Sequence, residues 1–146
     1  MAMTITERPT MTQRSPAAAT PKPLLRGWLH LGMAPVILIA GLILTALAPT
    51  QDTRLASAAY TLSAVMLFGT SAAYHRGNWK PSTLAVFRRL DHSNIFIFIA
   101  GTYTPLSFAL LEGTAKWTLV GLAWSVALLG VLFRLTWLSA PRWLYT

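Results

Sequence analysis

The chain runs for eighteen residues without a charged side chain between Leu31 and Ala48, with the sequence LGMAPVILIAGLILTALA. A helix needs about 20 mainly apolar residues to cross the roughly 30 Å hydrocarbon core of a bilayer. Three later windows have the same character, and none of the four carries Lys, Arg, Asp or Glu in its interior. Burying a charge in lipid is costly, so this absence is typical of membrane spans. We therefore expect an all-α integral membrane protein, a helical bundle with transmembrane helices at about 31–48, 55–75, 93–111 and 117–134.

The composition agrees with a membrane protein. Of the 146 residues, 54% are hydrophobic and only 11% are charged, whereas soluble domains carry about 25% charged residues. Four helices buried in a soluble core are the alternative, but core helices usually keep a polar face. The net charge of +8 would suggest nucleic acid in a soluble protein. Because the basic residues flank the apolar windows, we expect membrane lipids as partners and no nucleic acid.

The basic residues also give the helices a direction. Counted from the N-terminus, the five segments outside the windows carry 4, 1, 4, 1 and 2 Lys or Arg residues. Cytoplasmic segments are enriched in these residues. We therefore expect a bacterial plasma-membrane protein with a cytoplasmic N-terminus and a cytoplasmic loop between the second and third helices. Residues 1–25 hold almost no large apolar side chains and predict a disordered cytoplasmic tail before a membrane domain at 26–146.

Polar residues gather at the cytoplasmic side of this topology. Ser71 and His75 are four residues apart near the end of the second helix and so share one face. Asp91 opens the predicted third helix at the same depth, and His30 and His92 lie at that level too. Ionisable groups are rare in membrane helices and mark functional sites.

Each of these residues also has a purely structural interpretation. Asp91 could cap the third helix, because a carboxylate at a helix N-terminus satisfies free amides and the helix dipole. Ser71 could bond its own helix backbone, and His75 could meet lipid headgroups. Taken as a set, they suit a metal or proton-transfer site better. The chain has no cysteine, so a metal would be held by His or carboxylate groups, which suit zinc. His30 and His92 are possible additional ligands with poor spacing.

The same residues carry a resemblance to a known family. The chain resembles the bacterial hemolysin III family, which belongs with the progestin and adipoQ receptors. The similarity covers about Arg26 to the C-terminus and rests on SAAYHR at 71–76, RRLDHSN at 88–94, IAGTYTPL at 99–106 and WSVALLGVLFR at 124–134.

The resemblance implies a seven-helix bundle with zinc near the cytoplasmic face. His75 matches the family's zinc-binding histidine on the second helix, Ser71 its serine four residues earlier, and Asp91 the aspartate thought to hold the zinc-bound water. The family's other two zinc ligands form a His-x-x-x-His pair on the seventh helix. This sequence stops at Thr146, where residues 138–146 look like the start of a fifth helix, and lacks that pair. We therefore expect a truncated chain that holds four of seven helices, lacks the remaining zinc ligands and is inactive alone.

Three functions remain open. The first, by analogy with the receptor relatives, is a zinc-dependent hydrolase-like activity on lipid amides, with Ser71 and Asp91 as catalytic residues and His75 as the metal ligand. The second is a non-enzymatic membrane sensor or membrane-homeostasis factor. The third is a pore-forming cytolysin, which the sequence disfavours because the helices lack the polar stripe that would line a water-filled pore.

Overall fold

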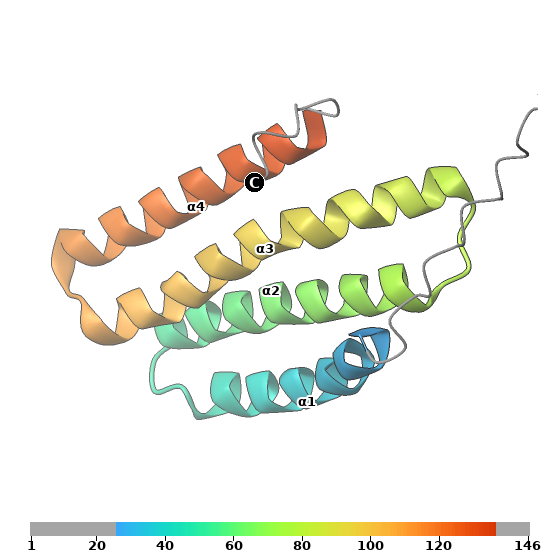
Figure 1. Ribbon diagram of the computed structural model, residues 1–146. Helices are drawn as coiled ribbons and strands as arrows, with labels where there is room; N and C mark the ends of the chain where they lie inside the picture. Colours follow the sequence, from blue (N-terminus) through green and yellow to red (C-terminus); the bar gives the residue numbers. More distant parts are fainter. Residues whose placement is uncertain (1–25, 137–146) are drawn as a thin grey trace, which may run out of the picture.

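The computed structural model describes residues 26–136 and builds them as four α-helices: α1 (Arg26–Leu47), α2 (Gln51–Arg76), α3 (Pro81–Leu110) and α4 (Gly113–Thr136). Short connections join the helices, so each one runs antiparallel to the one before it (Figure 1). Contacts between described helices join only neighbours in sequence: α1 with α2, α2 with α3, and α3 with α4. The four helices therefore form a row in chain order. The predicted tail at 1–25 and fifth helix at 138–146 lie outside the described residues.

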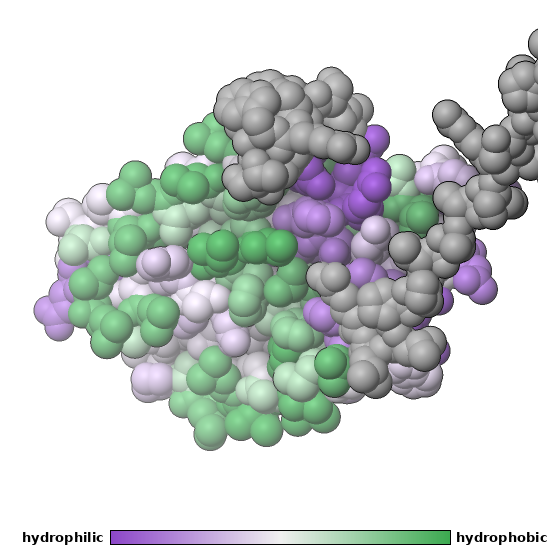
Figure 2. Space-filling view, viewed as in Figure 1, coloured by the Kyte–Doolittle hydropathy of each residue, from purple (hydrophilic) through white to green (hydrophobic). Residues whose placement is uncertain are grey.

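All four helices are long and apolar enough to cross a bilayer. The two inner helices differ from the two outer ones in burial. Within the most apolar window of each helix, 39% of α2 and 33% of α3 is buried, against 6% of α1 and of α4. Large apolar side chains cover the exposed faces, and hydrophilic ones gather toward the end where α2 leads into α3 (Figure 2). Such a surface requires an apolar solvent. The chain is a multi-pass membrane protein.

All four helices begin earlier than expected, and the difference is largest for α3. The third helix begins at Pro81, twelve residues before the expected start at 93. A search for apolar windows does not detect a charged helical stretch outside the hydrocarbon core. The available signal was Pro81, because proline is common at the first position of a helix. Asp91 is therefore the eleventh residue of α3 and does not open the helix, so the N-cap interpretation of Asp91 fails. Lys80 occupies the cap position instead.

Small and hydroxyl side chains fill the contacts between helices. The buried residues with side chains described are mostly Ala, Ser and Thr: Ala48, Ala56, Ser57, Thr61, Ser63, Ala64, Ser71, Ala72, Ser93, Asn94, Ala100, Thr104, Ser107 and Ala127. A Cβ atom at Gly41 would overlap Thr61, and one at Gly101 would overlap Ser63. Close backbone approach of this kind drives helix association in lipid, where the hydrophobic effect between helices is absent.

Candidate functional site

The polar residues lie at the end of the bundle where α1 begins, α2 ends, α3 begins and α4 ends. We call it the basic end, because Arg76, Lys80, Arg88, Arg89 and Arg134 are there. The opposite end has Asp52, Arg54, Glu112 and Lys116. All the sequence-predicted site residues fall at the basic end.

His75 lies in the last turn of α2, half-buried against the start of α1. Its ring centroid is 6.5 Å from that of His30 in α1 and 4.7 Å from that of Tyr74. The His30 ring also packs on Phe68, with 5.4 Å between ring centroids. The two helices approach closely here because of Gly27, where a Cβ atom would come within 3.1 Å of the His75 Cβ. The structure thus brings together two imidazoles that are 45 residues apart in the sequence.

The surrounding contacts hold this end in register. The Arg76 guanidinium carbon lies 3.7 Å from the centroid of the Trp28 ring, a cation–π contact between α2 and α1. The Trp79 indole N–H donates to the carbonyl of Ala73 at 2.8 Å, a second bond to an oxygen that also accepts from the Gly77 N–H at the end of α2. Trp79 also stacks near Phe87, with 4.6 Å between ring centroids. The connection from α2 to α3 is therefore tied to both helices.

Ser71 lies one turn before His75, and its side chain is 5% exposed. Asp91 is half-buried on α3. Its level is set by Asn94, whose amide donates to the Met66 carbonyl at 3.1 Å and to the Thr70 hydroxyl at 2.9 Å. Because α2 and α3 are antiparallel, Asp91, three residues before Asn94, lies at the level of the residue three positions after Thr70 on α2. Asp91 therefore lies between Ser71 and His75 in depth, as predicted.

His30 and His92, the two histidines considered in the sequence as additional metal ligands, lie in different surroundings. His92 is exposed, and its Nδ1 lies 2.6 Å from the carbonyl oxygen of Arg88 in its own helix, so it stands apart from the His30–His75 pair. Among residues 26–136, no group of three His, Asp or Glu side chains is arranged to hold a metal ion. Within residues 26–136, His30 and His75 are the two imidazoles whose rings lie close together. Imidazole nitrogens are donors that suit zinc.

Sequence reasoning missed the role of Asn94, which joins α2 to α3 through the two hydrogen bonds above. A carboxamide inside an apolar window was the available signal, since polar side chains in membrane helices bond across helices. It also missed Ser93, which is 2% exposed and whose hydroxyl has no hydrogen-bond partner among the described residues. The Trp124 indole N–H donates to the Thr104 hydroxyl at 3.0 Å and joins α4 to α3 in the same manner.

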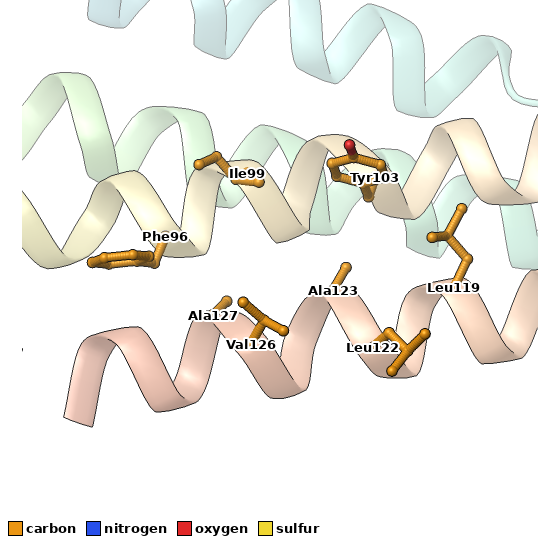
Figure 3. A pocket seen from close by; sticks show the side chains of 8 residues that line it. All are labelled: Phe96, Ile99, Tyr103, Leu119, Leu122, Ala123, Val126 and Ala127. Atoms are coloured by element: carbon orange, nitrogen blue, oxygen red, sulfur yellow. The ribbon is translucent and has the colours of Figure 1, made fainter. Parts of the chain in front are cut away.

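An apolar groove of about 420 Å³ lies between α3 and α4. Figure 3 shows the eight side chains that line it, three from α3 and five from α4: Phe96, Ile99, Tyr103, Leu119, Leu122, Ala123, Val126 and Ala127. Only the Tyr103 hydroxyl adds a polar side-chain group. The groove offers packing surface for lipid or another helix and no catalytic chemistry.

The architecture defines a polytopic α-helical membrane protein with a polar cluster at one end of its spans. The sequence profile described as "Haemolysin-III related" matches residues 18–146. The chain belongs to this family.

Sequence similarity to two bacterial proteins supports the same family assignment. The chain is 35% identical over 86 residues to "Hemolysin-3" of Bacillus cereus, a match that covers 59% of this chain and 39% of that protein. It is 37% identical over 76 residues to the "Hemolysin-3 homolog" of Bacillus subtilis strain 168, covering 52% of this chain and 35% of that protein. The chain thus matches less than half the length of these relatives. No solved structure matches it significantly.

Proposed function

We propose that α2 and α3 supply part of a zinc site at the basic end, and that this end faces the cytoplasm. The observation that carries the zinc site is the position of His75, half-buried 6.5 Å from the His30 ring and one turn from buried Ser71. The excess of Lys and Arg at the same end supports the orientation. Zinc would be held by His75, and Asp91, at a similar depth on α3, would hold a water molecule.

The proposed reaction is hydrolysis of a lipid amide. Zinc, when bound, supplies a Lewis acid and lowers the pKa of water toward neutrality. The chain's own residues would have three tasks. His75 binds the metal, and the Ser71 hydroxyl donates to the substrate oxygen on which charge develops. The Asp91 carboxylate orients and deprotonates the attacking water, then passes that proton to the amine that leaves when the C–N bond breaks. All three lie near the end of the spans, where the amide of a bilayer lipid also resides.

The test of catalysis compares lipid-amide turnover in vesicles by two versions of the chain extended to the length of its Bacillus relatives, so that the remaining zinc ligands expected from the family are present: the wild type and the Asp91→Asn variant. Asn keeps the size of Asp but cannot accept a proton, so turnover should fall by at least about 100-fold, the usual contribution of a general base. Asp52→Asn, at the opposite end of the bundle, is the control and should leave turnover unchanged. Equal turnover by wild type and Asp91→Asn would overturn the catalytic role and favour a sensor or membrane-homeostasis protein in which the metal is structural.

The orientation can be tested separately, because the chain has no cysteine to remove. A cysteine introduced at Asn78, in the α2–α3 connection, should be shielded in intact cells from a membrane-impermeant maleimide and react after permeabilisation. A cysteine at Glu112, in the α3–α4 connection, should react in intact cells. The reverse pattern would place the basic end outside the cell.

The pore-forming alternative gains no support from the described helices. The faces that α1 and α4 expose are rich in Leu, Ile and Val, whereas a water-filled pore needs a polar lining. Liposomes loaded with a fluorescent dye should retain it at high protein content. Release of the dye would support the pore-forming function.

A further inference from the structure

We propose that α3 and α4 bind an anionic phospholipid at the basic end, with its phosphate held by Arg89 and Arg134 and one acyl chain in the groove between the two helices. This inference does not depend on the proposed zinc site. The observation behind it is that two half-buried arginines, one from each helix, continue the two helix faces that line the apolar groove.

The groove runs along most of α4 and reaches the basic end. The cavity of about 420 Å³ shares Phe96 and Val126 with a second cavity of about 670 Å³, which extends along α4 to Phe133 and Thr136. The lining residues Leu119 and Phe133 are fourteen positions apart, which is about 21 Å at 1.5 Å per residue. One leaflet contributes about 15 Å, half of the roughly 30 Å hydrocarbon core. The groove is therefore long enough to take an acyl chain over the depth of a leaflet.

Arg89 and Arg134 lie on the same helix faces as the groove, at its basic end. Arg89 comes seven residues before Phe96 on α3, and Arg134 comes seven residues after Ala127 on α4. Seven residues are close to two helical turns, so each arginine shares a face with that lining residue. Both arginines are half-buried, whereas the neighbouring Arg88 is exposed and points about 100° away from Arg89. The arginines therefore continue the two walls of the groove.

The two arginines also lie at similar depths. A Cβ atom on Gly130 would come within 2.6 Å of the Phe96 ring, which places these two residues at one level. Arg134 is four residues beyond Gly130 and Arg89 seven residues before Phe96, so in antiparallel helices they differ in depth by three residues, about 4.5 Å. Packed helices are about 8–10 Å apart, a distance that two arginine side chains can bridge through one phosphate. Figure 2 shows hydrophilic side chains gathered where the end of α4 lies beside α3.

A phosphate diester with an acyl chain is the ligand whose chemistry matches this place. A guanidinium has five N–H donors in a planar fork and binds phosphate oxygens in pairs, with donors left for other contacts. Among the described side chains, the basic end has the five Lys and Arg residues named above and one carboxylate, Asp91. Asp91 is two residues from Arg89 and so lies on another face of α3. Basic pockets between membrane helices bind anionic lipid headgroups in this manner.

The experiment uses the 146-residue chain in a neutral detergent, with phosphatidylglycerol as the anionic probe and phosphatidylcholine as the zwitterionic one. Native mass spectrometry counts the lipids that each chain retains and shows its oligomeric state. The wild type should retain one phosphatidylglycerol, bound at least about fivefold more tightly than phosphatidylcholine. Arg89→Gln and Arg134→Gln should each weaken this binding about fivefold, the usual contribution of one basic residue to binding anionic lipid. Arg88→Gln removes the same charge from the exposed neighbouring position and should bind within about twofold of the wild type.

Two tryptophan substitutions on α4 test the position of the acyl chain. Val126 and Leu128 are both exposed, at 64% and 59%, but Val126 lines the groove and Leu128 does not. Val126→Trp fills the groove and should weaken phosphatidylglycerol binding at least about fivefold, because the acyl chain loses apolar contact with α4. Leu128→Trp adds the same ring elsewhere on α4 and should bind as the wild type does. Near-wild-type circular dichroism verifies that the variants remain folded, and the lipid preference of the wild type needs no substitution.

Three results would overturn the proposal. Equal retention of the two lipids, or equal weakening by Arg88→Gln and Arg89→Gln, would reduce the basic end to a diffuse positive surface. A dimer that keeps no lipid and dissociates in Val126→Trp would assign the groove to a second copy of the chain. Loss of phosphatidylglycerol from a chain extended to the length of its Bacillus relatives would assign the groove to the added segment.

Discussion

Replacing Asn94 by Ala should loosen the contact between α2 and α3 more than any other single polar substitution in the bundle. The Asn94 side chain is 4% exposed and is the described side chain that makes two hydrogen bonds to the neighbouring helix, to Met66 and Thr70. Hydrogen bonds between membrane helices contribute about 0.6 kcal/mol on average and up to about 1.7 kcal/mol each. Loss of both predicts a decrease of about 1–2 kcal/mol in the free energy of unfolding.

The assay is reversible unfolding in mixed micelles of increasing dodecyl sulfate fraction, followed by tryptophan fluorescence. Asn78→Ala, in the exposed connection after α2, controls for the loss of a carboxamide and should change the free energy by less than about 0.5 kcal/mol. A double-mutant cycle with Thr70→Val isolates the side-chain bond and should return a coupling of about 0.6 kcal/mol. An Asn94→Ala variant as stable as the wild type would refute the view that this amide joins the two helices.

Two further substitutions test the other helix contacts. Gly101→Ala places a Cβ atom on the Ser63 side chain, and such overpacking should cost about 1–3 kcal/mol in the same unfolding assay. Gly121→Ala, where nothing lies within 4 Å of the new Cβ, should be neutral or slightly stabilising, so equal effects at the two positions would contradict the packing described. Trp124→Phe removes the bond to the Thr104 hydroxyl and should lower the stability of the α3–α4 contact by about 0.6 kcal/mol. A coupling energy of zero in a double-mutant cycle with Thr104→Val would contradict a stabilising role for that bond.

The sequence was sufficient to predict the fold class and the number of spans described, because burial in lipid imposes a constraint that apolar windows report directly. It also placed Ser71, His75 and Asp91 at one depth, since helix length and topology alone determine depth. The start of α3 could not be found in this manner. The charged residues between Pro81 and Asp91 are helical, yet they resemble a loop to a search for apolar windows.

The pairing of His30 with His75 was equally beyond the sequence. Both residues were known to lie near one membrane face, but depth does not determine which sides of two helices meet. That is set by close approach at Gly27 and Gly41, and by the Trp28–Arg76 contact. Ser93 and Asn94 show the same limit, because adjacent residues on α3 point about 100° apart and only the packed structure identifies which one faces α2.

The most direct test of the proposed metal site is X-ray absorption at the zinc edge of a zinc-loaded chain in nanodiscs, extended to the length of its Bacillus relatives so that the remaining zinc ligands expected from the family are present. The wild type should show nitrogen or oxygen neighbours at about 2.0–2.1 Å, with outer-shell scattering from imidazole that weakens in His75→Ala and persists in His92→Ala. Zinc that is absent, or whose imidazole scattering is the same in His75→Ala as in the wild type, would contradict a metal site at the end of α2.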